Sequence, residues 1–224
     1  MTVLDVAAGN GNVAIEAARR GAKVTASDLT PSMVEMGRAR SEAEGLPITW
    51  LEADAEELAL PARSFDVVTS AFGAIFAPRP ERVAAELFRV ARPGGLVAMA
   101  NYTSRGFLAA FAELISDFAT PAPISLPSPF RWGDEAEVRR RFDGLASSIE
   151  VRPCTAAFEF GSTAEALGFM ERTNGGQLAL RSLLPEERYR EVVGQSERLV
   201  RQLNASRDGR TVLEFEYLIV LARA

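Results

Sequence analysis

The sequence predicts an α/β fold in which a mostly parallel sheet is covered by helices on both faces. Short apolar runs alternate with helical stretches over the first hundred residues, at positions 2–7, 24–27, 48–51, 65–71 and 96–100. Alternating strands and helices pair in parallel through right-handed crossovers, which place helices on both faces of the sheet. The runs contain few polar residues, as strands covered on both faces require. These observations together indicate a doubly wound sheet.

Turn and capping residues mark the ends of these elements. Thr30-Pro31 is typical of a helix start, because an N-cap residue is followed by proline, and this helix is expected to reach Gly45. Residues 81–90 carry apolar side chains at helical spacing. Pro93-Gly94-Gly95 is expected to form a turn before the fifth strand.

The alternation stops after residue 101. Ser104 is expected to cap a helix over residues 105–118 that has a phenylalanine-rich face. A proline-rich loop follows at residues 121–129. Proline restricts the backbone, so we expect a stiff connection here.

A capped helix and an edge strand follow this loop. Asp134 and Glu137 have the spacing of a capping box. The helix carries Arg139-Arg140-Arg141, which we expect on a solvated face beside glutamates rather than on a nucleic-acid surface. Ile149–Phe160 is predicted to be a strand, and Pro153 within it points to the edge of a sheet, because proline cannot donate to a neighbouring strand.

The last part of the chain combines helices with a final strand. Ser162 with Glu165 is typical of a helix start, and we expect two helices within residues 162–205, of which Pro185–Leu203 is the longer. Val212–Ala222 alternates apolar and acidic residues in its first half and then becomes apolar, which predicts a strand.

Composition excludes several kinds of site. The 224 residues include no histidine, one lysine (Lys23) and one cysteine (Cys154), so the most common general base and any cysteine-based metal cluster are absent. We predict no metal site. A net charge of −5 without a basic stripe disfavours nucleic-acid binding. Because no membrane-spanning run or signal peptide is found, we expect a cytoplasmic protein.

A glycine-rich loop lies between the first strand and the first helix. Gly9-Asn10-Gly11 permits a tight turn and a close approach of a ligand to the backbone, and the N–H groups of the following helix favour a polar or negative group. Asp28 ends the second strand, where its carboxylate can accept hydrogen bonds from both hydroxyls of a ribose. This pattern alone fits both NAD and S-adenosylmethionine.

Two further acidic positions favour a cationic ligand. Asp5 lies inside the first strand, four residues before Gly9, where a carboxylate would repel a pyrophosphate and attract an ammonium group. Glu52-Ala53-Asp54-Ala55 ends the third strand, where an acidic side chain can accept a hydrogen bond from an adenine amino group. Together with Asp28, these residues favour S-adenosylmethionine over NAD.

Ordered motifs along residues 2–101 resemble those of the class I S-adenosylmethionine-dependent methyltransferases. Residues 3–11 look like the first motif, with Ala7 where the family more often has glycine. Residues 65–71 resemble the fourth-strand motif, and residues 89–95 resemble the helix–turn before strand five. The small-molecule branch that includes the quinone-ring C-methyltransferases is the most similar.

The resemblance implies that S-adenosylmethionine is the cofactor and that the ends of the first four strands bind it. Asp28 matches the ribose ligand, Leu29 the residue that packs on adenine, and Asp54-Ala55 the contact with the adenine edge. The cofactor-binding residues expected in full are Asp5, Ala7, Gly9, Asn10, Gly11, Asp28, Leu29, Met33, Asp54, Ala55, Ser70, Ala71 and Phe72.

The acceptor pocket is expected outside the carboxyl ends of the strands. The candidate substrate-binding residues are Phe76, Asn101, Tyr102, Arg105, Phe107 and Trp132. Phe107 and Trp132 lie in inserted segments that are expected to form a cap over the sheet. For these aromatic residues, packing of the cap against the core is an equally good interpretation. No general base or other catalytic residue can be assigned, and the acceptor atom is left open. Because no concentrated charge lines the cap helices, we expect an apolar or aromatic acceptor.

We predict a Rossmann-like, mostly parallel seven-stranded sheet in the order 3-2-1-4-5-7-6, with an antiparallel C-terminal strand and helical cap insertions. We expect residues 1–224 to form a single methyltransferase domain, in which 1–101 bind the cofactor and 102–133 and 161–210 are insertions on the substrate side. Related enzymes carry a helical segment before the first strand. Here Met1 adjoins that strand, so either the pocket is open on this side or the chain is a fragment. The oligomeric state is left open.

Two other functions stay open at this point. An NAD-linked oxidoreductase of the short-chain type needs a tyrosine with a lysine four residues later, but no tyrosine precedes Lys23, the single lysine. A non-catalytic module that binds S-adenosylmethionine, or a purely structural one, would share the motifs without turnover. Measuring both S-adenosylmethionine binding and methyl transfer to an added acceptor distinguishes these functions.

Overall fold

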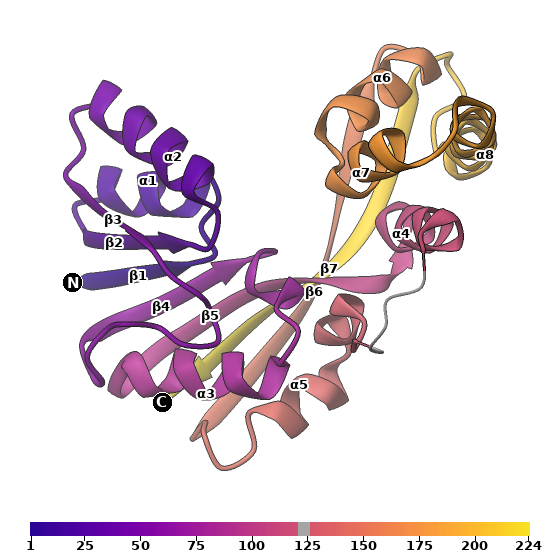
Figure 1. Cartoon of the computed structure of the whole chain (residues 1–224). Coiled ribbons are helices and arrows are strands. Elements are labelled where there is room, and N and C mark those ends of the chain that lie inside the picture. Colours follow the sequence, from indigo (N-terminus) through magenta and orange to yellow (C-terminus); the bar gives the residue numbers. More distant parts are fainter. Residues whose placement is uncertain (121–125) are drawn as a thin grey trace. The chain divides into compact units, whose positions relative to one another are not determined.

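The computed structural model of the chain describes residues 1–120 and 126–224 (Figure 1). Seven strands of the described residues form one sheet in the order β3-β2-β1-β4-β5-β7-β6. The strands are β1 (Thr2–Val6), β2 (Lys23–Asp28), β3 (Ile48–Glu52), β4 (Phe65–Ala71), β5 (Ala91–Gly106), β6 (Ser148–Phe160) and β7 (Thr211–Arg223). No helix in the described part of the chain is both long and apolar enough to cross a membrane.

Helices connect these strands. The α-helices are α1 (Asn12–Arg19), α2 (Pro31–Ala43), α3 (Pro80–Val90), α4 (Phe107–Phe118), α5 (Glu135–Arg141), α6 (Thr163–Thr173), α7 (Gly175–Leu183) and α8 (Glu186–Leu203). Two short 3-10 helices are η1 (Ala74–Phe76) and η2 (Pro129–Gly133).

The predicted sheet topology is confirmed. Strands β1 to β5 pair in parallel. The backbone at Gly94 and Gly95, near the start of β5, exchanges hydrogen bonds with Ala224 after the end of β7, so β7 runs antiparallel to β5. Pro153 lies in β6, which is an edge strand of the sheet. This position was predicted because proline has no N–H group to donate to a neighbouring strand.

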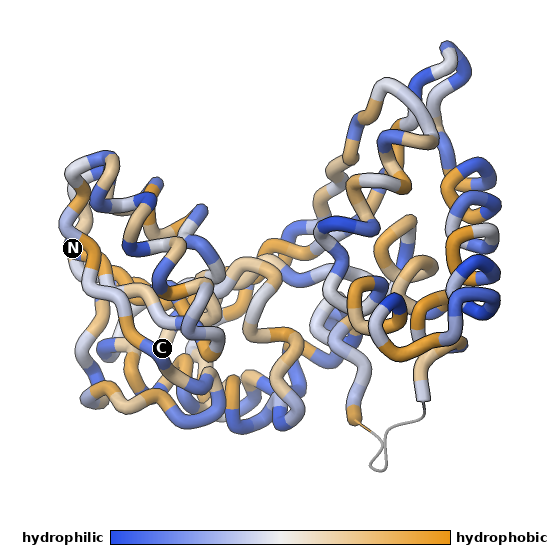
Figure 2. Tube along the Cα trace, turned by 45° about the horizontal axis from the view of Figure 1, so that its top comes forward, coloured by the Kyte–Doolittle hydropathy of each residue, from blue (hydrophilic) through white to orange (hydrophobic). Residues whose placement is uncertain are grey.

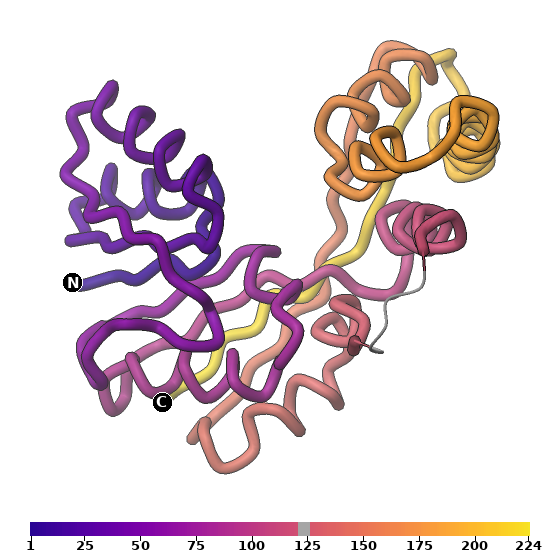
Figure 3. Tube along the Cα trace, in the orientation of Figure 1, coloured from indigo at the N-terminus to yellow at the C-terminus, as the bar shows by residue number. Residues whose placement is uncertain are grey.

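The described chain forms two compact units, which we describe separately. Unit 1 comprises residues 1–101, 127–153 and 218–224, and unit 2 comprises residues 102–126 and 154–217. Both chain ends, marked N and C in Figure 3, therefore belong to unit 1. In unit 1, α1 and α2 cover one face of the sheet through Val3, Ala14, Val24, Val34 and Trp50.

Unit 2 has its own core. Helices α4, α6, α7 and α8 pack around Phe107, Phe111 and Met170, and Leu213 of β7 adds a strand residue to this cluster. Along α8, hydrophobic and hydrophilic residues alternate with the helical period (Figure 2), so one side is buried and the other faces water. The two helices expected within residues 162–205 are in fact three, because Asn174 caps a separate start at α7.

The structure corrects two predictions around β5. Pro93-Gly94-Gly95 is not a turn before the strand but an irregular stretch inside it, since Phe65 of β4 pairs with Ala91 while Val67 pairs with Leu96. The strand also extends past Ser104, which therefore caps no helix. Helix α4 begins after Gly106, whose φ of 86° is a left-handed conformation that glycine adopts at low cost.

The predicted solvated arginine face on α5 is only partly correct. Arg139 and Arg140 are exposed, but the side chain of Arg141 is 1% exposed and its guanidinium carbon lies 4.3 Å from the centre of the Trp132 ring. Asp134 caps α5 as predicted. Glu137 does not complete the capping box, because its carboxylate pairs with Arg131, Arg140 and Arg141 instead. Part of the proline-rich loop, residues 121–125, lies outside the described residues.

Candidate functional site

The loop after β1 depends on three residues in the left-handed backbone region. Ala7, Gly9 and Gly11 have φ angles of 52°, 56° and 90°. Ala7 is the position at which the resemblance leads us to expect glycine, and its positive φ gives the reason, since a side chain is strained there. A Cβ atom at Gly11 would lie 2.6 Å from the Trp50 ring. The Trp50 indole therefore requires a glycine at this position, whether or not a ligand also uses the space.

The two loop glycines offer a matched pair of variants. Gly9→Ala should cost about 1–2 kcal/mol from backbone strain alone, because no atom lies within 4 Å of the added Cβ. Gly11→Ala should cost about 1–3 kcal/mol more, because the Cβ also collides with Trp50. Urea denaturation of both variants measures the difference. Equal losses would mean that the Trp50 contact relaxes freely.

Asp28 ties the end of β2 to the glycine loop. Its Oδ2 accepts a hydrogen bond of 2.8 Å from the Gly9 N–H, and its Oδ1 accepts one of 2.9 Å from the Thr30 N–H. The carboxylate is partly exposed and an ionised carboxylate has about four acceptor positions, so it can hold the loop and also accept from ligand hydroxyls.

Asp5 is a buried carboxyl group at the same edge of the sheet. It is 1% exposed, and it accepts hydrogen bonds from the Ala14 N–H (3.0 Å) and from the Thr69 hydroxyl (3.0 Å). Burial raises its pKa to about 7; the two hydrogen bonds oppose this effect, and the charge of Asp28 adds to it. Because the ionised carboxyl groups of Asp5 and Asp28 repel each other, a cation bound near them would reduce this repulsion.

These residues border a cavity of about 250 Å³. Its lining consists of Asp5, Ala8, Asn12, Val13, Ala71 and Phe72. The sheet register explains the grouping: Asp5 pairs with Thr69, and parallel partners point to the same face, so Asp5 and Ala71 share one face of the sheet. The cavity thus brings together Asp5, Ala71 and Phe72 from the predicted cofactor residues.

The other predicted cofactor residues lie at the same edge in varied environments. Leu29 is 63% exposed and Met33 is also exposed, so both are available to an apolar ligand surface. The Asp54 carboxylate accepts from the Glu56 N–H, and Ala55 is buried beside it. Ser70 points to the opposite face of β4 from Ala71, and its hydroxyl accepts from the Ala74 N–H.

Sequence reasoning missed two residues that shape the loop. The Arg40 guanidinium donates to the Asn10 carbonyl (2.8 Å) and to Asn12 Oδ1 (3.1 Å), which braces the loop from α2. Gly73 approaches Ala7 so closely that a Cβ atom would lie 2.2 Å from the Ala7 carbonyl oxygen. Arg40 follows Asn10 by thirty residues and has no pattern to mark it. Gly73 lies two residues after the end of the fourth-strand motif, and this position is a usable signal.

The predicted acceptor residues do not share one environment. Phe76 is exposed on η1, whereas Trp132 is buried in unit 1 and Phe107 is buried in the core of unit 2. For Trp132 and Phe107 the structure therefore supplies the packing role. Arg105 forms an ion pair of 2.9 Å with Glu216 in unit 2.

Asn101 and Tyr102 cannot face the same side of β5. Val68 of β4 pairs with Val97, and Ala71 pairs with Ala100. Alternation therefore places Ala100 on the face of the Asp5 cavity and Asn101 on the other face. Asn101 is fully buried, and its amide atoms have no hydrogen-bond partner among the described residues.

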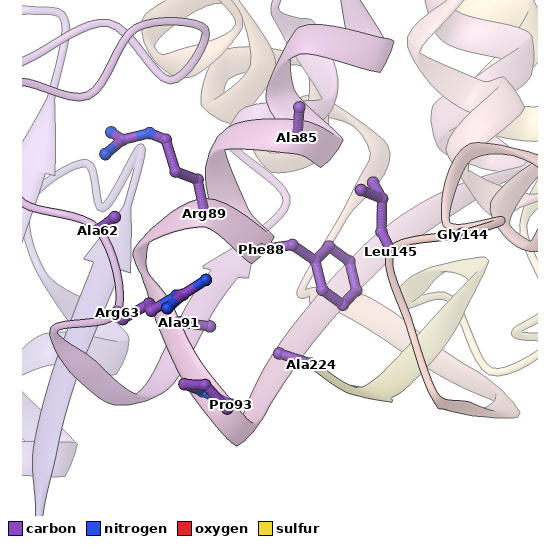
Figure 4. A pocket seen from close by; sticks show the side chains of 10 residues that line it. All are labelled: Ala62, Arg63, Ala85, Phe88, Arg89, Ala91, Pro93, Gly144, Leu145 and Ala224. Atoms are coloured by element: carbon purple, nitrogen blue, oxygen red, sulfur yellow. The ribbon is translucent and has the colours of Figure 1, made fainter.

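A second, larger cavity of about 470 Å³ lies at the other end of the strands (Figure 4). Phe88, Leu145 and Ala224 contribute to its lining, and Ala91 places it at the start of β5. Because ligands of doubly wound sheets bind at the carboxyl ends of the strands, the smaller Asp5 cavity is the better candidate site.

Comparisons with known proteins agree with this geometry. A family described as "Methyltransferase domain" matches residues 3–95. An uncharacterised protein of Mycobacterium tuberculosis is 38% identical over 223 residues, which cover 99% of this chain and 80% of that protein. Demethylmenaquinone methyltransferase of Thermus thermophilus is 39% identical over 102 residues, which cover 45% of this chain and 46% of that enzyme.

Solved structures share the fold. A candidate methyltransferase of Bacillus halodurans superposes with a TM-score of 0.68 at 21% identity, covering 99% of this chain and 91% of that one. Phosphoethanolamine N-methyltransferase 2 of Haemonchus contortus, solved with S-adenosylhomocysteine, gives a TM-score of 0.59 at 19% identity, with coverages of 99% and 48%. With its ordered motifs, its sheet order and these relatives, the chain belongs to the class I S-adenosylmethionine-dependent methyltransferase family.

Proposed function

We propose that this protein transfers a methyl group from S-adenosylmethionine to a small apolar or aromatic acceptor. The observation that carries the proposal is the pair of carboxyl groups, Asp5 and Asp28, that flank one glycine loop at the carboxyl ends of β1 and β2. A dinucleotide would bring a pyrophosphate to this loop and face both negative charges, whereas S-adenosylmethionine brings an ammonium and a sulfonium group.

The residues of the site fit the parts of this cofactor. Asp28 would accept from the ribose hydroxyls while it holds the Gly9 N–H. Asp5 would face the ammonium group across the cavity that it lines. Exposed Leu29 and Met33 would cover the adenine, and Asp54 with Ala55 would contact its edge.

The chemistry asked of the protein is mainly positioning. When bound, S-adenosylmethionine supplies an electrophilic methyl group on sulfur. The protein must hold the acceptor atom in line with that methyl group and exclude water. Because the chain has no histidine, an acceptor that is already nucleophilic, such as a thiolate, an amine or an enolate, suits it best.

Calorimetry and a turnover assay test the proposal. We expect S-adenosylmethionine and S-adenosylhomocysteine to bind and NAD⁺ not to bind. We also expect S-adenosylhomocysteine to form with at least one of four acceptor classes, which are quinols, phenols, thiols and amines. Tight NAD⁺ binding would support an oxidoreductase instead. Cofactor binding without turnover on any of these acceptor classes would support a non-catalytic module.

A further inference from the structure

The cavity of about 470 Å³ at the amino ends of the strands has no part in the proposed function. All the residues that line it belong to unit 1. They come from the turn before β4, from α3, from the start of β5, from the segment between α5 and β6, and from Ala224 after β7 (Figure 4). Its volume is within the range of about 300–1,000 Å³ that is typical of small-molecule sites.

Much of the lining of this cavity is apolar. Phe88 is buried and packs edge-on against Phe142, with ring centroids 4.9 Å apart, so its ring is held in place. Leu145 is 36% exposed, and Ala62 and Pro93 are exposed as well. An apolar ligand that covered these side chains would remove apolar surface from water, which is favourable in proportion to the area buried.

Arg63 brings an unpaired guanidinium to the same cavity. Its backbone N–H donates to the Arg89 carbonyl (2.9 Å), and the next N–H along the chain donates to the Val90 carbonyl (2.8 Å), so the turn is fixed against the end of α3. The Arg63 side chain is exposed, and within the described residues it forms no hydrogen bond or ion pair. Its φ of 55° is left-handed, as are those of Ala7 and Phe72 at the candidate cofactor site. Strained residues of this kind concentrate at functional sites.

The second arginine of the lining is already paired. Arg89 donates to Glu86 and to two backbone carbonyls, and its guanidinium is turned away from the Phe88 ring in Figure 4. Arg63 is therefore the charged side chain of the lining that has no partner in the described part of the chain. A guanidinium can offer two parallel N–H groups to one carboxylate, and its single charge matches that of a monoanion.

We propose that this cavity binds a small carboxylate with an apolar body, whose carboxylate pairs with Arg63 and whose body lies against Phe88 and Leu145. The site lies at the opposite end of the strands from the Asp5 cavity, and the proposal does not depend on the proposed function. Both parts of the ligand are needed. An apolar lining alone favours an uncharged ligand, because a carboxylate loses hydration there. An exposed ion pair alone contributes only about fivefold or less.

Octanoate, 1-octanol and acetate test the proposal on the full chain. NMR of labelled leucine methyl groups follows each titration, with Leu145 in the cavity and exposed Leu29 near the candidate cofactor site as a reference. We expect octanoate to shift the Leu145 signals and to bind more tightly than 1-octanol. Acetate should bind at least about tenfold more weakly than octanoate, because it buries no chain. Equal or tighter binding of 1-octanol, or an octanoate response at Leu29 without one at Leu145, would overturn the proposal.

Two matched variants test the contact with Arg63. Arg63→Gln removes the charge but keeps a long side chain in the same left-handed backbone conformation, so the midpoint of urea denaturation should change little. It should weaken octanoate about fivefold and leave 1-octanol unchanged. Arg38→Gln is the control, because Arg38 is an exposed arginine on α2 whose side chain also has no partner among the residues described. It should change neither affinity. Equal octanoate losses in the two variants, or no loss in Arg63→Gln, would show that Arg63 does not hold the carboxylate.

Discussion

Asp5→Asn is expected to stabilise the ligand-free protein near neutral pH while it weakens cofactor binding. In the wild-type protein, burial raises the Asp5 pKa from 3.8 to about 7. A shift of this size corresponds to about 4 kcal/mol between the protonated and ionised forms in the folded state. Asparagine keeps the shape, can accept from the Ala14 N–H and can donate to the Thr69 hydroxyl, and it carries no charge to desolvate.

The sign of the pH dependence follows from the raised pKa. Between pH 3.8 and about 7, folded Asp5 holds its proton while unfolded Asp5 has lost it, so the folded state binds more protons. The stability contributed by Asp5 is therefore complete below pH 3.8 and is lost as the pH rises through about 7. Urea denaturation should show the advantage of Asp5→Asn growing with pH, to about 4 kcal/mol near pH 8.

Asp66→Asn provides a control of opposite sign. Hydrogen bonds from the Thr2 N–H, Arg92 and the Thr2 hydroxyl lower the Asp66 pKa to about 2, so its ionised form stabilises the fold. At neutral pH this variant should be less stable than the wild-type protein. The difference should shrink as the pH falls from the unfolded aspartate pKa of 3.8 toward the folded Asp66 pKa of about 2. If both variants shift stability in the same direction, the burial of Asp5 is not the cause of the Asp5→Asn effect.

The cofactor should respond to Asp5→Asn in the opposite way to stability. Loss of one charge-assisted contact weakens binding by about 1.5–3 kcal/mol, which is at least about tenfold. Wild-type affinity should also rise between pH 5.5 and about 7.5, because the carboxyl group must ionise to face a cation. Asp5→Asn should lack this rise. A variant with unchanged affinity would place the ammonium group elsewhere.

Local sequence patterns were sufficient to predict the sheet and the glycine loop, because turn residues and apolar runs determine the structure of segments only a few residues long. Gly9, Asp28 and the edge position of Pro153 are of this kind. The brace from Arg40 and the contact of Gly11 with Trp50 depend on side chains brought together by packing of α2 and β3, and no local pattern encodes them.

Geometry that the sequence already contains limits two of the predictions, of which the first is only partly correct and the second is still untested. Three successive residues of an α-helix span about 200° around its axis, so Arg139, Arg140 and Arg141 could not all face water on a helix that packs on the core. Similarly, Asn101 and Tyr102 are neighbours in one strand and must point to opposite sides. Which side faces the cavity depends on the pairing of β5 with β4, and this register could not be inferred from the sequence alone.

Asp28→Ala is expected to weaken S-adenosylhomocysteine binding by about 2–3 kcal/mol, or about 30- to 150-fold, through loss of charge-assisted hydrogen bonds. The structure adds a second route to this loss, because the same carboxylate also holds the N–H groups of Gly9 and Thr30. A loose loop and a missing ribose contact would both lower affinity. Calorimetry with a single ligand therefore cannot assign the effect.

A second ligand and a second variant separate the two routes. If Asp28 binds the ribose, the 2′-deoxy analogue of S-adenosylhomocysteine should bind the wild-type chain more weakly than the parent, and Asp28→Ala should remove most of that difference. Arg40→Ala is the matched control, since it loosens the loop at Asn10 and Asn12 without touching the carboxylate. It should weaken both ligands by the same factor. If Asp28→Ala also weakens both ligands equally, or changes affinity less than about threefold, its carboxylate positions the loop and the ribose is bound elsewhere.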